Sequence, residues 1–120
     1  MPMVQCDLSQ ALFDAKRDAI SDAIHQGLIA GLGMTPDDLF QVFRPHAPGE
    51  MVFSPGFGGA DRRDLTLIRV TMVHMFSVAI KQLMYEQIVR RLEAVGLRHD
   101  DILICVVENG FEDWYAGGEL

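Results

Sequence analysis

Pro2 is the residue whose type and position most clearly suggest chemistry, because it directly follows the initiator methionine. Removal of Met1 would leave Pro2 with a free secondary amine, whereas a retained Met1 would keep the Pro2 nitrogen as an amide without basicity. An α-amino group titrates at about 7.7 to 8.0 in model peptides, and desolvation disfavours its charged form, which moves this value towards neutral pH. Chance placement of a proline is the alternative, but we predict that Pro2 takes and gives protons.

Two other side chains could assist such a proton transfer. Asp38 is expected beside a strand, where a carboxylate can orient water or a proton donor. Capping of a short helical turn explains Asp38 equally well, because Asp37 also suits a helix start. His74 ends an apolar run, where an imidazole can enter an active site; a structural histidine in the core or at an interface is the alternative. We expect Asp38 to act with Pro2, and His74 to assist them.

The remaining polar residues do not form a metal or nucleotide site. The four histidines are dispersed without metal-ligand spacing, so neither a metal nor a cofactor is expected. The glycine-rich stretch 55–59 lacks the lysine and helix start of a phosphate-binding loop. Arg69 stands alone in an apolar strand and needs a carboxylate partner. Arg69 either binds a carboxylate across a subunit boundary or forms an ordinary structural ion pair.

Composition and charge narrow the class of protein. Of the 120 residues, 49% are hydrophobic and 22% charged, which is typical of a folded chain of one domain, residues 1–120. Ten Lys and Arg against 17 Asp and Glu give a net charge of −7, which disfavours nucleic acid and anionic membranes as partners. The longest charge-free apolar stretch, residues 70–80, is shorter than the ~18 residues of a membrane span. With no signal pattern at the start, we expect a cytoplasmic protein.

The hydrophobic pattern predicts four principal strands and two long helices. The strands are expected at 2–8, 40–44, 65–73 and 102–107, with a further short strand at 51–53 before a glycine-rich loop over 54–64. One helix follows a cap at Ser9 and ends at Gly31 or Gly33, and the other lies between Ser77 and Gly96. Cys6 and Cys105 fall in the strands and are expected as buried thiols rather than a disulfide.

These elements form two strand-helix-strand halves, about residues 1–60 and 61–120, which predict one α+β two-layer fold. A long helix between two strands usually makes a right-handed parallel crossover. Two such tandem β-α-β units side by side form a four-stranded sheet with both helices on one face. Because the strands carry apolar residues on both faces, the other face needs a cover, and copies of the same chain provide it most simply. The expected assembly is a homo-oligomer.

Pro2 at the start of a strand, together with two β-α-β halves and an apolar self-association face, resembles the tautomerase superfamily over nearly the whole chain. The residues most similar to its malonate semialdehyde decarboxylase branch, in order and spacing, are Met1-Pro2, His25, Asp38 with Gln41, the turn 48–50, Glu108-Asn109 and Asp113-Trp114. The resemblance implies a trimer in which Pro2 is the central catalytic group. It also implies that Asp38 assists the proline or activates water, and that Trp114 forms an aromatic wall of the cavity.

The decarboxylase pattern departs at His74 and Phe76, which occupy the positions of two arginines that hold the substrate carboxylate. A carboxylate buried without a cation is costly, so we expect a tautomerase that acts on a small enolisable oxo acid or a related carbonyl compound. His74, Phe76 and Trp114 are the expected substrate-binding residues. One alternative is decarboxylase or hydratase activity with a displaced arginine, for which the candidates are Arg44, Arg62, Arg63 and Arg69. Another alternative is a noncatalytic oligomeric binding protein.

Overall fold

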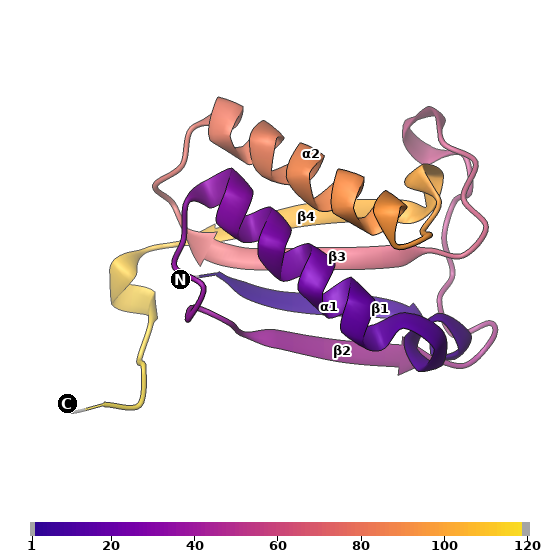
Figure 1. The fold of residues 1–120 in the computed structure, drawn as a ribbon, viewed down its shortest axis with the longest axis horizontal. Coiled ribbons are helices and arrows are strands. Elements are labelled where there is room, and N and C mark those ends of the chain that lie inside the picture. Colours follow the sequence, from indigo (N-terminus) through magenta and orange to yellow (C-terminus); the bar gives the residue numbers. More distant parts are fainter. Residues whose placement is uncertain (1, 119–120) are drawn as a thin grey trace.

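A computed structural model describes residues 2–118 as two layers, a four-stranded sheet with both helices on one of its faces (Figure 1). The strands are β1 (Met3–Ser9), β2 (Gln41–His46), β3 (Thr66–Val73) and β4 (Ile102–Asn109), and the helices are α1 (Gln10–Leu32) and α2 (Val78–Ala94). The element order is therefore β1-α1-β2 followed by β3-α2-β4. This architecture confirms the predicted α+β two-layer fold of tandem β-α-β units.

The two long helices begin at the predicted caps. Ser9 Oγ accepts a hydrogen bond of 3.2 Å from the Leu12 N–H at the start of α1, and Ser77 Oγ accepts one of the same length from Ile80 in α2. These bonds satisfy N–H groups that have no partner inside the helix. Gly33 ends α1 with a positive φ of 72°, the left-handed conformation that glycine adopts without strain.

The sheet order is β2-β1-β3-β4, which makes β1 and β3 the central strands. β1 is parallel to β2 and antiparallel to β3, and β3 is parallel to β4. The start of β1 therefore lies beside the start of β2 and near the ends of β3 and β4. Figure 1 shows that α2 also begins at this end of the sheet.

The core lies between the sheet and the two helices. Its most deeply buried strand residues are Val4, Cys6 and Leu8 of β1 and Ile68, Val70 and Met72 of β3. The helices approach closely because Gly31 has no side chain: a Cβ there would lie 2.5 Å from the Met84 Cα. The packed helices hold the ends of the strands in fixed relative positions.

The second face of the sheet is uncovered in the single chain. Arg69 is exposed on this face, opposite Gln5 of β1 and Cys105 of β4. The prediction of two buried thiols is therefore wrong for Cys105, which is exposed, and correct for Cys6. Burial, with a smaller contribution from Asp7, raises the pKa of the Cys6 thiol to about 12.

The predicted strand at 51–53 is wrong. This part of the chain is irregular and leads to the short helix η1 (Phe57–Gly59). Strands are stabilised by pairing with a neighbour, and residues 51–53 pair with none within the described chain. Met51 and Phe53 instead line a cavity of about 540 Å³ beside the start of α1. In residues 2–118, no helix is long and apolar enough to cross a membrane.

Candidate active site

Pro2 is buried and directly precedes the central strand β1. Met3 pairs with Thr71 of β3, so extending the register by one residue puts Pro2 opposite Met72. Side chains alternate along a strand, so Pro2 shares the helix-facing side with Val4. The Pro2 nitrogen thus belongs to the end of the sheet where β2 begins and β3 and β4 end.

Asp38 is brought to the same end by the segment between α1 and β2. The Val4 N–H donates a 2.9 Å hydrogen bond to the Phe40 carbonyl, and Val4 pairs with Gln41. A turn closes where the Asp38 N–H donates to the Thr35 carbonyl at 3.1 Å. The Asp38 side chain is half-buried, and within residues 2–118 its carboxylate has no recorded hydrogen-bond or ion-pair partner. It is therefore available to a ligand.

Two residues of α1 hold this segment in place. His25 Nε2 lies 2.8 Å from the Pro36 carbonyl oxygen, so Nε2 carries the proton that makes this hydrogen bond. Ser21 Oγ donates to Gln41 Oε1 at 2.6 Å, and Gln41 Nε2 donates back to the Ser21 carbonyl at 3.1 Å. These contacts give His25 and Gln41 a structural role that their spacing in the sequence did not reveal.

His74 follows the end of β3 and joins a polar cluster with two residues that sequence reasoning missed as site residues. Its Nδ1 lies 2.7 Å from Glu108 Oε2, and Lys81 Nζ lies 2.6 Å from Glu108 Oε1. The hydrogen bond from Lys81, and secondarily that from His74, hold the pKa of Glu108 below its usual range, against an opposing effect of desolvation. We name these three residues the Glu108 cluster.

Phe76 and Trp114 lie in the segments that leave β3 and β4. Phe76 is partly buried and packs against the core. Trp114 Nε1 donates a 2.8 Å hydrogen bond to Asn109 Oδ1, and the Asn109 carbonyl accepts one of 2.8 Å from the His74 N–H. Asn109 therefore joins the Trp114 segment to the His74 segment, at the end of the sheet where Pro2 lies.

Within the described chain, none of the four arginines that could bind a substrate carboxylate lies at the Pro2 end of the sheet. Arg44 lies 3.4 Å from Asp7, near the far end of β1, and Arg69 lies in the middle of the uncovered face. Arg62 and Arg63 belong to the connection that enters β3. The cation at the Pro2 end is Lys81, in the first turn of α2. It is 27 residues from Glu108 in sequence, so only the folded chain reveals the pair.

The sequence profile of the tautomerase enzyme family matches residues 38–117, so this chain belongs to that family. Two probable tautomerases of Bacillus subtilis (strain 168) are similar over nearly its whole length. YusQ is 30% identical over 98% of this chain and 94% of its own. YrdN is 24% identical over 98% of this chain and 92% of its own.

Solved structures of two malonate semialdehyde decarboxylases are also similar to this chain. One is the FG41 enzyme inhibited by 3-bromopropiolate, with 26% identity, a TM-score of 0.90, and coverage of 97% of this chain and 89% of that one. The other is 29% identical, with a TM-score of 0.89 and coverage of 97% and 91%, and its structures address decarboxylase and hydratase activities. These findings confirm the resemblance drawn from the sequence.

Proposed function

We propose that this tautomerase family member uses the nitrogen of Pro2 to transfer a proton on a small enolisable oxo acid or a related carbonyl compound. The observation that carries the proposal is the position of Pro2, buried at the start of a central strand. Asp38 precedes the neighbouring strand β2, and His74 and Trp114 follow β3 and β4 at the same end of the sheet. We therefore propose that acid, base and aromatic groups from these four segments act around the Pro2 nitrogen.

The proposed reaction needs Pro2 as a free amine, hence with Met1 removed. The neutral amine takes a proton from the carbon next to the carbonyl, and the electron pair of the broken C–H bond moves towards the carbonyl oxygen. The protonated amine then returns the proton to carbon or exchanges it with water. Asp38 is proposed to orient the amine or a water molecule, while His74 stabilises the developing oxygen charge and Phe76 and Trp114 flank the substrate.

We further propose that the working form is a homotrimer. A fused 4-OT symmetric trimer shares the fold, with a TM-score of 0.80 and 14% identity. In the single chain, large apolar side chains near the Pro2 end are exposed, among them Phe40, Val78 and Phe111. Contiguous exposed apolar groups often mark subunit contacts. Light scattering should give three chains per particle, and thiol labelling should find Cys105 protected; a monomer with rapidly labelled Cys105 would contradict the trimer.

Ketonisation of phenylenolpyruvate by wild type and Pro2→Ala tests the proton-transfer function. Alanine leaves a terminal amine after methionine removal but loses the ring that fixes the nitrogen. We expect kcat/KM to fall by about 100-fold or more, the range of a general acid or base. Pro48→Ala, in the exposed turn after β2, is the matched control and should retain activity. Equal rates for wild type and Pro2→Ala would remove Pro2 from the mechanism.

Decarboxylase or hydratase activity is a second candidate, favoured by the two decarboxylase structures and by the cation Lys81 at the Pro2 end. In this reaction a protonated Pro2 would polarise the carbonyl while a cation binds the carboxylate. Carbon dioxide release from malonate semialdehyde distinguishes it from tautomerisation. Met1 retained in protein made by its native host would instead favour a noncatalytic binding protein, and an intact-mass spectrum detects it.

A further inference from the structure

We propose that Glu108 is a positioning residue that holds the imidazole of His74 in one tautomer, with Nε2 directed away from Glu108 to exchange a proton with the substrate oxygen. This inference rests on the proposed function, because it assigns the partner of Pro2 in the same reaction. Neither the resemblance nor the comparisons give a role to Glu108 or to Lys81.

The geometry of the Glu108 cluster requires one arrangement of protons. An ionised carboxylate only accepts hydrogen bonds, so the 2.7 Å contact to Glu108 Oε2 places a proton on His74 Nδ1. In a neutral imidazole with Nδ1 protonated, Nε2 carries the free lone pair. The His74 side chain is 76% exposed, so its ring is accessible in the single chain, whereas Glu108 is only 24% exposed.

Lys81 keeps Glu108 in the form that this arrangement needs. Its ammonium group lies 2.6 Å from Glu108 Oε1, so each carboxylate oxygen serves a different partner. The hydrogen bond from Lys81 is also the main reason why the pKa of Glu108 is lowered, which keeps the carboxylate ionised at neutral pH. Lys81 and Glu108 together have no net charge, so the Glu108 cluster becomes cationic only when His74 takes up a proton.

The strand register sets the spacing between the two proton-handling groups. Glu108 pairs with Met72, and Pro2 lies opposite Met72 on the other side of β3. Two strand spacings separate the Pro2 and Glu108 backbones, about 10 Å. His74 follows β3, the strand between these two backbones, and its ring meets Glu108 on the β4 side. A small oxo acid between them can contact Pro2 at carbon and His74 at oxygen.

The protons balance in such a reaction. In ketonisation, the enol O–H gives its proton to His74 Nε2 while the protonated Pro2 amine gives a proton to carbon. The O–H and N–H bonds break, a C–H bond and an N–H bond form, and the enol π electrons supply the new C–H bond. Proton exchange with water then restores both groups. Among the described residues, Glu108 of β4 contacts His74 directly, and Lys81 of α2 contacts the other oxygen of the same carboxylate.

The chain contains a matched control for the His74–Glu108 contact. His99 Nδ1 lies 3.2 Å from Glu93 Oε1, and both side chains are exposed. This pair joins the end of α2 to the short helix η2 (His99–Asp101), at the opposite end of the sheet. Glu93→Gln therefore removes the same kind of carboxylate from a histidine without touching the Pro2 end.

The test compares wild type, Glu108→Gln, Glu93→Gln and His74→Asn. We expect kcat/KM for phenylenolpyruvate to fall about 10-fold in Glu108→Gln, an effect of the size of one charge-assisted hydrogen bond. It should fall about 100-fold in His74→Asn, as for a general acid or base. Adding Glu108→Gln to His74→Asn should cause no further loss. Glu93→Gln should match wild type. His74→Asn changes an exposed side chain, so it keeps the test valid if Glu108→Gln misfolds.

One readout separates positioning from a structural role. Nitrogen-15 spectra of the imidazoles should show His74 with Nδ1 protonated in wild type and in mixed tautomers in Glu108→Gln.

Unchanged spectra and rates in Glu108→Gln would overturn the inference even if Pro2→Ala is inactive. Equal rates for wild type and Pro2→Ala, or a wild type inactive on carbonyl probes, would overturn the proposed function and the catalytic role of His74 with it. The imidazole spectra then still decide whether Glu108 positions the ring.

Discussion

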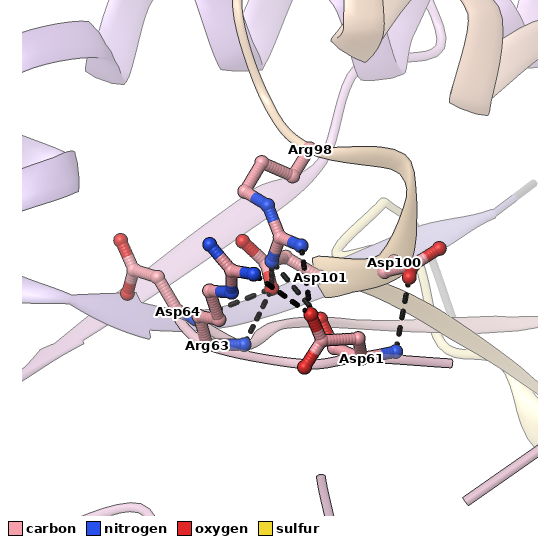
Figure 2. A network of polar contacts seen from close by, with 6 residues as sticks. All are labelled: Asp61, Arg63, Asp64, Arg98, Asp100 and Asp101. Atoms are coloured by element: carbon pink, nitrogen blue, oxygen red, sulfur yellow. Dashed lines mark hydrogen bonds and ion pairs between the residues drawn. The ribbon is translucent and has the colours of Figure 1, made fainter. Parts of the chain in front are cut away.

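The two ends of the sheet use polar groups in opposite ways. At the end far from Pro2, the buried Asp101 accepts hydrogen bonds from the Arg63 and Asp64 N–H groups at 2.8 and 3.2 Å and from Arg98 at 2.9 Å (Figure 2). This network ties the connection before β3 to the start of β4. At the Pro2 end, by contrast, His74 is exposed and the Asp38 carboxylate has no recorded partner among the described residues. The Asp101 carboxylate is satisfied within the chain, whereas the Asp38 carboxylate retains hydrogen-bonding capacity for a ligand.

Among the described residues, large apolar side chains are exposed near both ends of the sheet, and they are more numerous at the Pro2 end, since the far end exposes Val52 and Phe57. Near the Pro2 end the segments flanking the strands expose Leu39, Phe40, Met75, Val78, Phe111 and Tyr115. The polar network at the other end is compact, and its Asp100 also receives the Asp61 N–H at 2.9 Å (Figure 2). If the Pro2 end carries the proposed chemistry, stability and chemistry are separated along the strands, so substitutions at the two ends should have different consequences.

Asp101→Ala should have the largest effect on stability. It leaves two backbone N–H groups and Arg98 without their shared acceptor, so we expect a loss of about 3 kcal/mol in the free energy of unfolding. Urea unfolding measures this loss. Asp100→Ala, which removes one accepted hydrogen bond, should cost about 1 kcal/mol. Ketonisation per folded molecule should stay at the wild-type level in both. A loss of activity in folded Asp101→Ala would show that the two ends are not separate.

His25→Ala should give the reverse pattern at the Pro2 end. The substitution frees the Pro36 carbonyl and loosens the turn that carries Asp38, so we expect about 10-fold lower kcat/KM, the size of one lost positioning hydrogen bond. The free energy of unfolding should change by about 1 kcal/mol or less. His99→Ala is the control, a histidine at the other end, and should leave the rate unchanged. Wild-type activity in His25→Ala would exclude a positioning role for His25.

Acid should produce the smallest of these effects, through Glu108. The folded state lowers the pKa of Glu108, so the ionised carboxylate contributes fully to stability at pH values above the ordinary carboxyl pKa. This contribution is lost as the pH falls through the lowered pKa of the folded state. The urea midpoint should therefore drop slightly more in wild type than in Glu108→Gln between neutral and acidic pH. Glu93→Gln, compared in the same way, should behave like wild type. An equal drop in wild type and Glu108→Gln would show that the Glu108 cluster contributes nothing to stability.

The local elements could be predicted from the sequence because their signals are local. Ser9, Gly33 and Ser77 mark helix ends through hydrogen bonds and backbone conformation within a few residues. Pairing depends on distant parts of the chain, and this is where prediction failed. The run 51–53 has strand-like composition but no neighbour, and Cys105 lies in an apolar strand but on its uncovered face.

The candidate site shows the same limit. Pro2 could be singled out from the sequence because the chemistry proposed for it depends on its place in the chain. The Glu108 cluster could not, because Glu108 is 34 residues from His74 and 27 from Lys81 in sequence. The sequence singles out His74 as a candidate and Glu108 belongs to the family resemblance, but nothing in the sequence joins either of them to Lys81. Only the pairing of β3 with β4 and the position of α2 bring them together.

The most direct test of the central claim compares two forms of the same chain, one with Met1 removed and one with Met1 retained, each verified by intact mass. The forms differ in whether the Pro2 nitrogen is an amine or an amide. We predict that the form without Met1 ketonises phenylenolpyruvate at least about 100-fold faster, because an amide nitrogen can neither take up nor give the transferred proton. Equal rates for the two forms would contradict the account.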